Sequence, residues 1–588
     1  MTKEKGNIFD LKLFSKLMAF VKPYKRTYYF VMFAAILLAG FSSFTPYLLK
    51  VVVDDFIRLK DYDGMVFIIT LMLITLLAEV TFQFLFVFFA NLLGQNVIKD
   101  LRKELFEKIV GFKMAYFDQS AVGRLVTRAV NDIETIASIF SQGLFMIIAD
   151  LLKMTVVIII MLAVDWQLSL IVFSILPLII YATRLFQKSM KSAFEEVRLQ
   201  VANLNSFIQE RISGMQIVQI FHREKLEYDK FKNINEKHKK AWLKTVWYNS
   251  IFFPVAEISS SITLGLLVWY GGLNVALGGS ISLGTIFLFI QMSQMLFRPL
   301  RQIADKFNTL QMGMVATDRI FRILAIQSKI EDVGKCDPKA IDGKISIKNL
   351  SFSYIPDQEV IHGIDLEIKP GEKIAIVGAT GAGKSTLINL LSRFYDFEKG
   401  SIHLDNHSIK EFTLKSLRKH VGIVLQDVFL FADTIYNNIT LFNPDVKPET
   451  VYEAARQIGV HQFIESLPGG YDYNVKERGV MLSSGQRQLI SFLRVYISDP
   501  SVLILDEATS SIDSHSEELI KNATHKITAN KTSILIAHRL STIRNADRII
   551  VMDAGKIVEM GSHKELMSLE DGYYAQLYKI QFLEVAVV

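Results

Sequence analysis

The sequence predicts a multi-pass α-helical membrane domain, with six long helices that extend into the cytoplasm, followed by an α/β domain. Two observations lead to this fold class. Hydrophobic residues make up 51% of the 588 residues, and the mean hydropathy of +0.30 is too high for an ordinary soluble protein. Long apolar runs fill residues 28–300, whereas short strands, turns and amphipathic helices alternate after about residue 330. We therefore expect a membrane domain fused to a soluble domain.

Changes in composition also set the expected domain boundaries. They are 1–27 for a cytoplasmic amphipathic segment, 28–315 for the transmembrane domain, 316–344 for a linker, 345–580 for the soluble domain and 581–588 for a tail. The net charge of +6 is small for this length and is spread out, which argues against nucleic acid as a partner. The single cysteine, Cys336, excludes an internal disulfide framework and a cysteine metal cluster.

Six apolar runs are long enough to cross a hydrocarbon core about 30 Å thick, and the first is too long for a cleavable signal. They lie at 28–53, 65–94, 136–163, 167–187, 247–272 and 282–302. Lys and Arg gather before the first run, between the second and third, and between the fourth and fifth. The positive-inside rule therefore places the N-terminus and the soluble domain in the cytoplasm.

Two of the cytoplasmic connections have a helical pattern of their own. Residues 97–112 and 192–231 carry apolar residues at three- and four-residue spacing with charged faces, so the membrane helices should continue beyond the bilayer. A break at 114–125 interrupts the first connection, with Asp118 or Ser120 as expected helix caps and Gly123 as a turn.

Several polar residues fall inside the apolar runs, where a charge is costly and usually faces the bundle interior or a water-filled cavity. They are Glu79, Gln83, Asp150, Lys153, Glu257, Gln291 and Gln294. Asp150 and Lys153 are three residues apart and could pair on one helix face. Glu79 and Glu257 have no local partner in the sequence, and each either lines a substrate path or is neutral or hydrogen-bonded between helices. The pattern leaves both alternatives open, and it assigns no substrate-binding residue.

The soluble domain opens with a nucleotide-binding motif. The segment "KIAIVGATGAGKSTLINLL" reads as a strand, a glycine-rich turn and a helix, and it fits G-x-x-x-x-G-K-[ST]. Backbone N–H groups of such a loop cradle phosphates, Lys384 would bridge outer phosphate oxygens, and the Ser385 hydroxyl would hold Mg²⁺. The expected nucleotide-binding residues of the loop are Gly378, Ala379, Thr380, Gly381, Ala382, Gly383, Lys384, Ser385 and Thr386.

A second motif, "SVLILDEATSSID", runs an apolar strand into two acids. Asp506 at the strand end is placed to hold Mg²⁺, and Glu507 to orient or deprotonate an attacking water. Together the two motifs predict an ATPase that uses Mg²⁺.

With these motifs in order, residues 10–580 resemble a half-transporter of the ATP-binding-cassette (ABC) superfamily, of the exporter type with six spans and one nucleotide-binding domain. Further segments carry the resemblance: "LSFSY" with Tyr354, "VGIVLQ" with Gln426, "VKERG" with Glu477, "LSSGQ" at 482–486, "SSID" with Asp513 and "LIAHRL" with His538. Residues 116–136 and 213–231 resemble the coupling regions of these exporters.

The resemblance implies the roles of these residues. Tyr354 would stack on adenine. Gln426 would sense the metal held by Ser385 and Asp506. Glu477 would respond to the position of the transmembrane helices. Glu507 and His538, with Gln426, would be catalytic, and Asp513 would form the D-loop. Ser483, Gly485 and Gln486 of the signature segment would contact ATP held by a second chain.

The function expected from the resemblance is ATP-driven export of a small amphipathic, drug-like or lipid substrate across the cytoplasmic membrane by a dimer of half-transporters. Lipid flipping is a variant of this function, and an ATP-switched channel or regulator is an alternative. Two departures from the family pattern, Ser484 where glycine is usual and Ile512 where leucine is usual, leave identical and different partner chains equally open.

Overall fold

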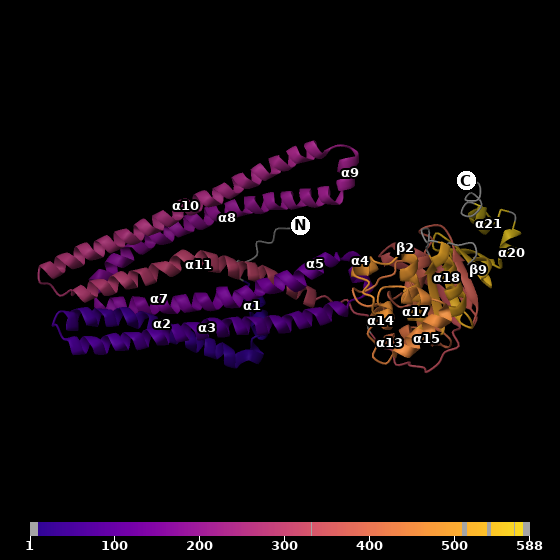
Figure 1. The fold of residues 1–588 in the computed structure, drawn as a ribbon, viewed down its shortest axis with the longest axis horizontal. Coiled ribbons are helices and arrows are strands. Elements are labelled where there is room, and N and C mark those ends of the chain that lie inside the picture. The colour runs from indigo at the N-terminus through magenta and orange to yellow at the C-terminus, as the bar shows by residue number, and fades with distance from the viewer. Residues whose placement is uncertain (1–9, 331, 508–513, 538–542, 570, 580–588) are drawn as a thin grey trace. The chain divides into compact units, whose positions relative to one another are not determined.

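A computed structural model of the chain describes residues 10–330, 332–507, 514–537, 543–569 and 571–579. Its contacts divide the chain into two compact units (Figure 1). The helical unit comprises Met1–Val110 and Ala121–Gln327, and the α/β unit comprises Gly111–Ser120 and Ser328–Val588.

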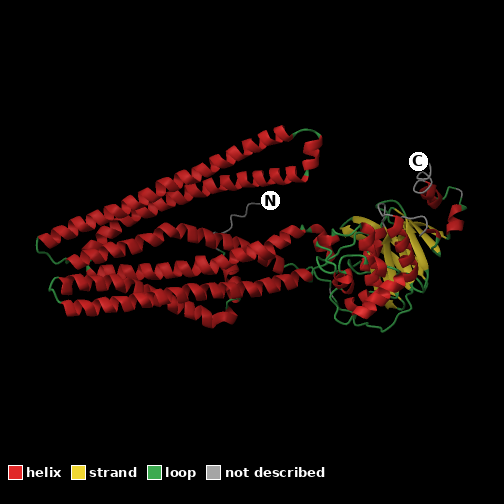
Figure 2. Ribbon diagram, in the orientation of Figure 1, coloured by secondary structure: helices red, strands yellow, loops and turns green. Residues whose placement is uncertain are grey.

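The helical unit consists of long helices joined by short turns (Figure 2). Its α-helices are α1 (Leu11–Ala19), α2 (Lys25–Val51), α3 (Tyr62–Val110), α5 (Val122–Thr127), α6 (Ile133–Ser138), α7 (Phe145–Val164), α8 (Trp166–Ser213), α9 (Met215–Ile220), α10 (Glu224–Ala276) and α11 (Leu283–Leu324). A 3₁₀ turn, η1 (Lys22–Tyr24), precedes α2, and π-helical turns η2 (Val52–Ile57), η3 (Arg128–Asp132) and η4 (Ile139–Leu144) continue neighbouring helices.

Three of these helices are far longer than a membrane is thick. α3, α8 and α10 have 49, 48 and 53 residues, and a rise of about 1.5 Å per residue makes each more than 70 Å long. A membrane core takes about 30 Å of this length. The prediction that the membrane helices continue beyond the bilayer is therefore confirmed.

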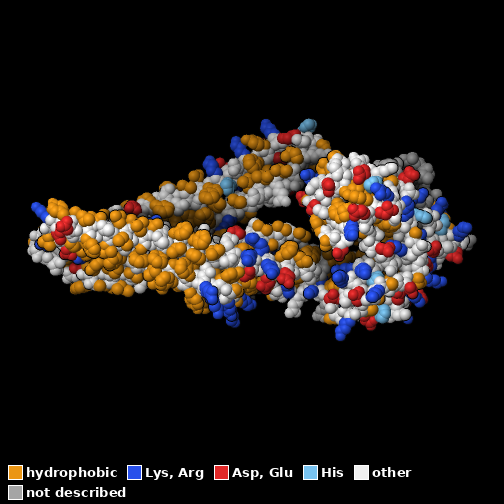
Figure 3. Space-filling view, turned by 60° about the horizontal axis from the view of Figure 1, so that its bottom comes forward, with side chains coloured by type: hydrophobic (Ala, Val, Ile, Leu, Met, Phe, Trp, Pro, Cys, Tyr) orange, Lys and Arg blue, Asp and Glu red, His pale blue; other side chains and the backbone are white. Residues whose placement is uncertain are grey.

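The surface of the helical unit is strongly apolar. Figure 3 shows a broad stretch of hydrophobic side chains along the helices, with charged side chains gathering beyond it. Phe33 of α2 and Phe67 and Phe84 of α3 are more than half exposed. A soluble protein does not tolerate an apolar surface of this extent, so it indicates contact with lipid.

Among the described residues, five stretches of helix are long and apolar enough to cross a membrane. They are Lys22–Ile57, Tyr62–Val110, Val122–Val164, Trp166–Ser213 and Glu224–Ala276, and they contain the first five predicted runs. The sixth run, 282–302, falls in α11, which is helical but is not among the five. Gln291, Gln294 and Arg298 lower the hydropathy of this run. α11 also continues to Leu324, so the segment predicted as a linker from residue 316 begins as helix.

The interior of the helical unit is built from α7, α8, α10 and α11. Leu288, Phe289 and Met292 of α11 are fully buried there, together with Leu168 of α8 and Leu267 of α10. Because lipid tails are as apolar as these side chains, close van der Waals packing between the helices holds this interior together.

Asp150 has a distant partner in addition to its neighbour on the same helix. The Asp150 carboxylate of α7 accepts a hydrogen bond from the Lys306 ammonium of α11, which lies 156 residues further along the chain. The Asp150 charge also acts favourably on Lys153, three residues along α7, so the local interaction is present beside the distant bond. Glu79 and Arg298 also lie within electrostatic reach of Lys153, so charged groups from three helices meet in this part of the unit.

The predicted break at 114–125 is present, and one of the two alternative caps is confirmed. Two short helices meet here, α4 (Met114–Gln119) and α5, and they are separated at Ser120 and Ala121. Ser120 is the C-cap of α4, whereas Asp118 lies inside α4 and Gly123 inside α5, so Asp118 is not a cap and Gly123 is not a turn.

The α/β unit contains two sheets. A four-stranded antiparallel sheet has the order β2-β1-β4-β5, and a six-stranded, mostly parallel sheet has the order β10-β9-β3-β8-β7-β6. The strands are β1 (Ile345–Ile355), β2 (Gln358–Ile368), β3 (Lys373–Val377), β4 (Lys399–Leu404), β5 (His407–Ser408), β6 (Val421–Val424), β7 (Val502–Glu507), β8 (Thr532–Ala537), β9 (Arg548–Asp553) and β10 (Lys556–Gly561).

Besides α4, helices and turns surround the two sheets. They are α12 (Lys384–Leu391), α13 (Leu414–His420), α14 (Ile435–Thr440), α15 (Pro448–Ile458), α16 (His461–Glu465), η5 (Gly470–Asp472), η6 (Glu477–Gly479), α17 (Ser484–Ser498), α18 (Ser514–Ile527), α20 (His563–Met567) and α21 (Tyr573–Tyr578). Apolar strand residues such as Ile374, Ile376 and Ile504 are fully buried between them. The core fixes the strand ends on which the candidate site is built.

Candidate nucleotide site

The candidate site lies at one edge of the six-stranded sheet. Strands β3, β8, β7 and β6 are neighbours in that order and run parallel, so their carboxyl ends share an edge. Open parallel sheets bind ligands at this edge. The glycine-rich loop follows β3, Asp506 and Glu507 end β7, and Gln426 comes two residues after β6. Residues more than 120 positions apart in sequence are thereby gathered at one edge.

Glycines give the loop after β3 its shape. Gly383 has a φ of +98°, which favours glycine, and a Cβ there would lie 2.8 Å from the Ile361 side chain. A Cβ on Gly378 would lie 2.2 Å from the Met552 carbonyl oxygen. The backbone can follow this path only without side chains at these two positions, and the N-terminus of α12 then opens toward the loop.

Lys384 is held inside its own loop. The side chain is 8% exposed, and its ammonium donates hydrogen bonds to the Gly378 and Ala379 carbonyl oxygens at 2.8 and 2.9 Å. Burial lowers the pKa of Lys384, and the Asp506 carboxylate acts in the opposite direction. The positive charge is therefore poorly compensated, which suits it to a phosphate group.

Tyr354 and Thr386 connect the end of β1 with α12. The Tyr354 hydroxyl donates to Thr386 Oγ1 at 3.2 Å and accepts from Asn389 Nδ2 at 3.3 Å. Tyr354 is still 37% exposed. An aromatic ring is thus fixed beside the phosphate loop with surface left for a base to stack on.

The acidic residues follow from the strand register. In β7, Asp506 lies opposite Ile536 of β8, and Glu507 opposite Ala537. Asp506 is partly buried and close enough to influence Lys384. The Glu507 side chain, Asp513 and His538 lie outside the part of the chain that the structure describes. Their predicted roles remain predictions, although β8 ends directly before His538.

The signature segment caps a helix. Ser483 precedes α17, and its Oγ accepts from the Gln486 N–H at 3.2 Å while its own N–H donates to Gln486 Oε1 at 2.9 Å. This reciprocal pair is a capping box. Ser484 is exposed and Gly485 is buried. The helix N-terminus, with its partial positive charge, is therefore rigid and accessible from solvent.

Gln426 and Glu477 are exposed, in keeping with roles that require contact with another group. None of the sequence motifs includes Arg494 of α17. Its side chain holds the segment after Gln426 against the signature helix. Its guanidinium donates to the Phe429 carbonyl, the Asn438 carbonyl and Asn438 Oδ1. Burial lowers the pKa of Arg494 to about 10, so it stays charged at neutral pH. A lone arginine inside the apolar stretch "LISFLRVYI" is the signal that points to it.

Comparison with known proteins decides the family. The model of the ABC transporter transmembrane region matches residues 28–300, and the model described as ABC transporter matches residues 361–510. A putative multidrug export ATP-binding/permease protein of Bacillus subtilis is 35% identical over 587 residues, with 97% of this chain and 99% of the relative covered. The chain belongs to the ABC transporter family.

Other relatives and one solved structure agree. An ATP-dependent lipid A-core flippase of Syntrophus aciditrophicus is 34% identical over 575 residues, which cover 98% of this ABC transporter and 95% of the relative. The solved structure of a bacterial Atm1-family ABC exporter with ATP bound matches with a TM-score of 0.76 at 26% identity, over 95% of this chain and 98% of the other. The predicted fold class and family are confirmed. The chain is an ATP-hydrolysing transporter with the half-transporter architecture of an exporter, which implies a dimer.

Proposed function

We propose that this ABC transporter exports an amphipathic drug-like or lipid substrate across the cytoplasmic membrane, as a dimer that hydrolyses ATP. The observation that carries the proposal is the fusion of an exporter-type helical unit and a complete set of nucleotide motifs in one chain. Relatives named as multidrug exporters and as lipid flippases both support an amphipathic substrate.

Within the site, the residues of this chain have separate roles. Lys384 and the α12 N-terminus bind phosphates, Tyr354 stacks on adenine, and Glu507 polarises the attacking water. His538 stabilises the transferred phosphate. Ser385, Asp506 and Gln426 carry the hard oxygen ligands that Mg²⁺ prefers, and they would hold it at the phosphates. When bound, Mg²⁺ supplies neutralisation of phosphate charge.

The second half of each site comes from the other chain. The N-terminus of α17, with Ser483, Gly485 and Gln486, attracts an anion and would complete the site around the γ-phosphate. ATP then favours the closed pair of α/β units, and hydrolysis releases it. A ligand shifts such an equilibrium only by its differential affinity for the two states.

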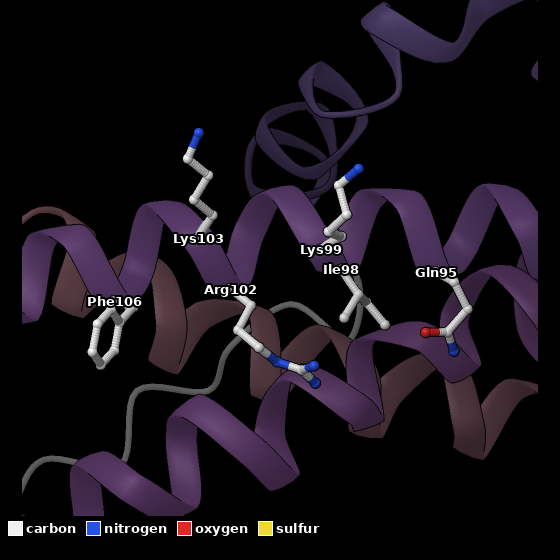
Figure 4. Close-up of a pocket in the computed structure, with 6 residues that line it drawn as sticks. All are labelled: Gln95, Ile98, Lys99, Arg102, Lys103 and Phe106. Carbon is white, nitrogen blue, oxygen red and sulfur yellow. The ribbon is translucent and has the colours of Figure 1, made fainter.

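Charge supports a cytoplasmic location of the α/β unit. Just past the second predicted run, α3 carries a groove lined by Gln95, Ile98, Lys99, Arg102, Lys103 and Phe106. Figure 4 shows Lys99 and Lys103 pointing to one side of the helix and Arg102 to the other. Arg102 pairs with Glu134 of α6 at 3.7 Å, whereas the two lysines suit anionic headgroups of an inner leaflet.

Vectorial transport in proteoliposomes tests the function. The purified chain, reconstituted with its α/β unit outward, should concentrate a cationic fluorescent dye in the lumen or move a fluorescent phospholipid between leaflets when MgATP is added. A panel of both classes separates drug export from lipid flipping. ATP hydrolysis without movement of any panel member, together with ATP-gated ion conductance, would instead establish an ATP-switched channel.

A further inference from the structure

Tyr354 is part of a cluster of three aromatic rings. The ring centroids of Phe352 and Tyr354 are 4.9 Å apart at 86°, and those of Tyr354 and Tyr395 are 4.9 Å apart at 88°. Phe352 and Tyr395 close the triangle at 5.8 Å and 71°. Edge-to-face contacts of this kind are favourable and directional. The orientation of the Tyr354 ring is therefore tied to that of Tyr395.

Tyr395 also contacts a segment that is distant in sequence. Its hydroxyl donates a hydrogen bond to the Asp118 carboxylate of α4, 277 residues earlier in the chain. α4 lies between α3 and α5 in sequence but belongs to the α/β unit. The Lys113 N–H just before α4 donates to the Ser328 carbonyl at 2.7 Å and anchors the same segment.

The chemistry of Tyr395 suits a lasting hydrogen bond. Burial, and then the bond to Asp118, raise the pKa of the Tyr395 hydroxyl, so it remains a protonated donor at neutral pH. Tyr395 comes four residues after α12, the helix that begins with Lys384. A continuous line of contacts thus runs from Thr386 through Tyr354 and Tyr395 to Asp118.

We propose that Tyr395 is a positioning residue that couples nucleotide binding at Tyr354 to the short helix α4. The proposal rests on the proposed function, because it takes Tyr354 as the ring on which adenine stacks. Adenine restrains Tyr354, which restrains Tyr395 through the ring contact and holds its hydroxyl on Asp118. Coupling between binding sites is reciprocal, so movement of α4 away from Tyr395 weakens nucleotide binding. This route is separate from Gln426.

Hydrogen exchange of the full-length chain in lipid nanodiscs tests the coupling. In the wild-type chain, saturating MgAMP-PNP should slow amide exchange in residues 111–120 by about fivefold or more, the lower range of measured coupling factors. Tyr395→Phe removes only the hydroxyl and Asp118→Asn weakens only the acceptor. Each should lose most of the nucleotide-dependent slowing, and the double variant should lose no more than the single variants.

Nucleotide affinity provides the second readout. Tyr395→Phe keeps the ring, so its MgAMP-PNP affinity should change by less than about threefold, whereas Tyr395→Leu removes the ring support of Tyr354 and should weaken affinity further. Tyr471→Phe is the matched control, because Tyr471 is a buried tyrosine of the same unit whose hydroxyl bonds to His461 instead. It should behave as wild type in both measurements.

Two results would overturn the proposal. One is full nucleotide-dependent slowing at 111–120 in Tyr395→Phe, and the other is equal loss in Tyr395→Phe and in the Tyr471→Phe control. A failure of the proposed function looks different, because transport in proteoliposomes would then be absent while the nucleotide-dependent slowing at 111–120, and its loss in Tyr395→Phe, would be unchanged.

Discussion

Arg494 joins two segments of the α/β unit through its guanidinium group. Its three acceptors, two carbonyl oxygens and one amide oxygen, belong to Phe429 and Asn438, and Asn438 is fully buried. Asn438 Oδ1 also accepts from the Phe431 N–H at 2.8 Å, so removal of Arg494 costs chiefly the bonds to the two carbonyl oxygens, about 1 to 3 kcal/mol each.

The variant Arg494→Leu should therefore destabilise the α/β unit by about 2 to 4 kcal/mol, since a hydrogen bond to a charged group contributes about 1.5 to 3 kcal/mol. The melting temperature measured by intrinsic fluorescence should fall by about 5 °C or more. Arg456→Leu is the control, because Arg456 is an exposed arginine that only approaches Glu453 at 4.0 Å. Similar melting temperatures for the two variants would show that the Arg494 contacts contribute no more than a surface ion pair.

A second prediction at this scale concerns Glu507. Glu507→Gln keeps the size of the side chain but removes the base, so ATP should still bind while turnover falls about 100-fold or more. Equilibrium binding and steady-state ATPase assays check the two halves of the prediction. Glu453→Gln, an exposed glutamate of α15, serves as the control. Hydrolysis at a near wild-type rate in Glu507→Gln would remove Glu507 from the mechanism.

The signature segment combines helix capping with an expected role in nucleotide binding. Ser483 and Gln486 close the capping box of α17, and the same residues are expected at the phosphates of a second chain. An identical type of box, Ser562 with Glu565, caps α20. Substitutions in the two boxes therefore distinguish a loss of helix capping from a loss of nucleotide binding.

Replacement of either capping serine by alanine should cost about 1 kcal/mol of stability, whereas glycine costs only a few tenths. Ser483→Ala and Ser562→Ala should therefore lower the melting temperature similarly. Only Ser483→Ala should also lose ATPase activity, by about tenfold, the loss expected for one hydrogen bond to a charged group. Ser483→Gly should stay stable but lose ATPase activity by a similar factor, and wild-type ATPase activity in that variant would restrict Ser483 to capping.

Local patterns predict the elements well because the forces behind them are local. The lengths of α3, α8 and α10 follow from apolar runs and helical spacing, and the turn between β3 and α12 follows from its glycines. Contacts between distant elements do not follow, because they depend on tertiary packing. Sequence spacing therefore does not reveal that Asp150 bonds to Lys306, or that Asp118 bonds to Tyr395 and does not cap a helix.

At the scale of the whole molecule, the open question is which chain completes each site. The phosphate loop and the acids lie at the edge of one sheet, while the exposed N-terminus of α17 would serve the nucleotide of a second chain. A pair of identical chains has two equivalent sites related by a two-fold axis. Ser484 stands at the position where an asymmetric pair would differ, and it does not choose between the two arrangements.

Complementation between two inactive variants tests the two-chain site directly. Lys384→Ala disables the phosphate loop, and Gly485→Asp places a negative charge at the signature helix, so each variant alone should lose ATPase activity at both sites. A mixed dimer gathers both defects in one site and leaves the other intact. In an equal mixture half of the dimers are mixed, so activity should recover to about one quarter of wild type. Absence of recovery, when the wild-type chain alone is an active dimer, would mean that each site is built within a single chain. An inactive, monomeric wild-type chain would instead require a different partner chain.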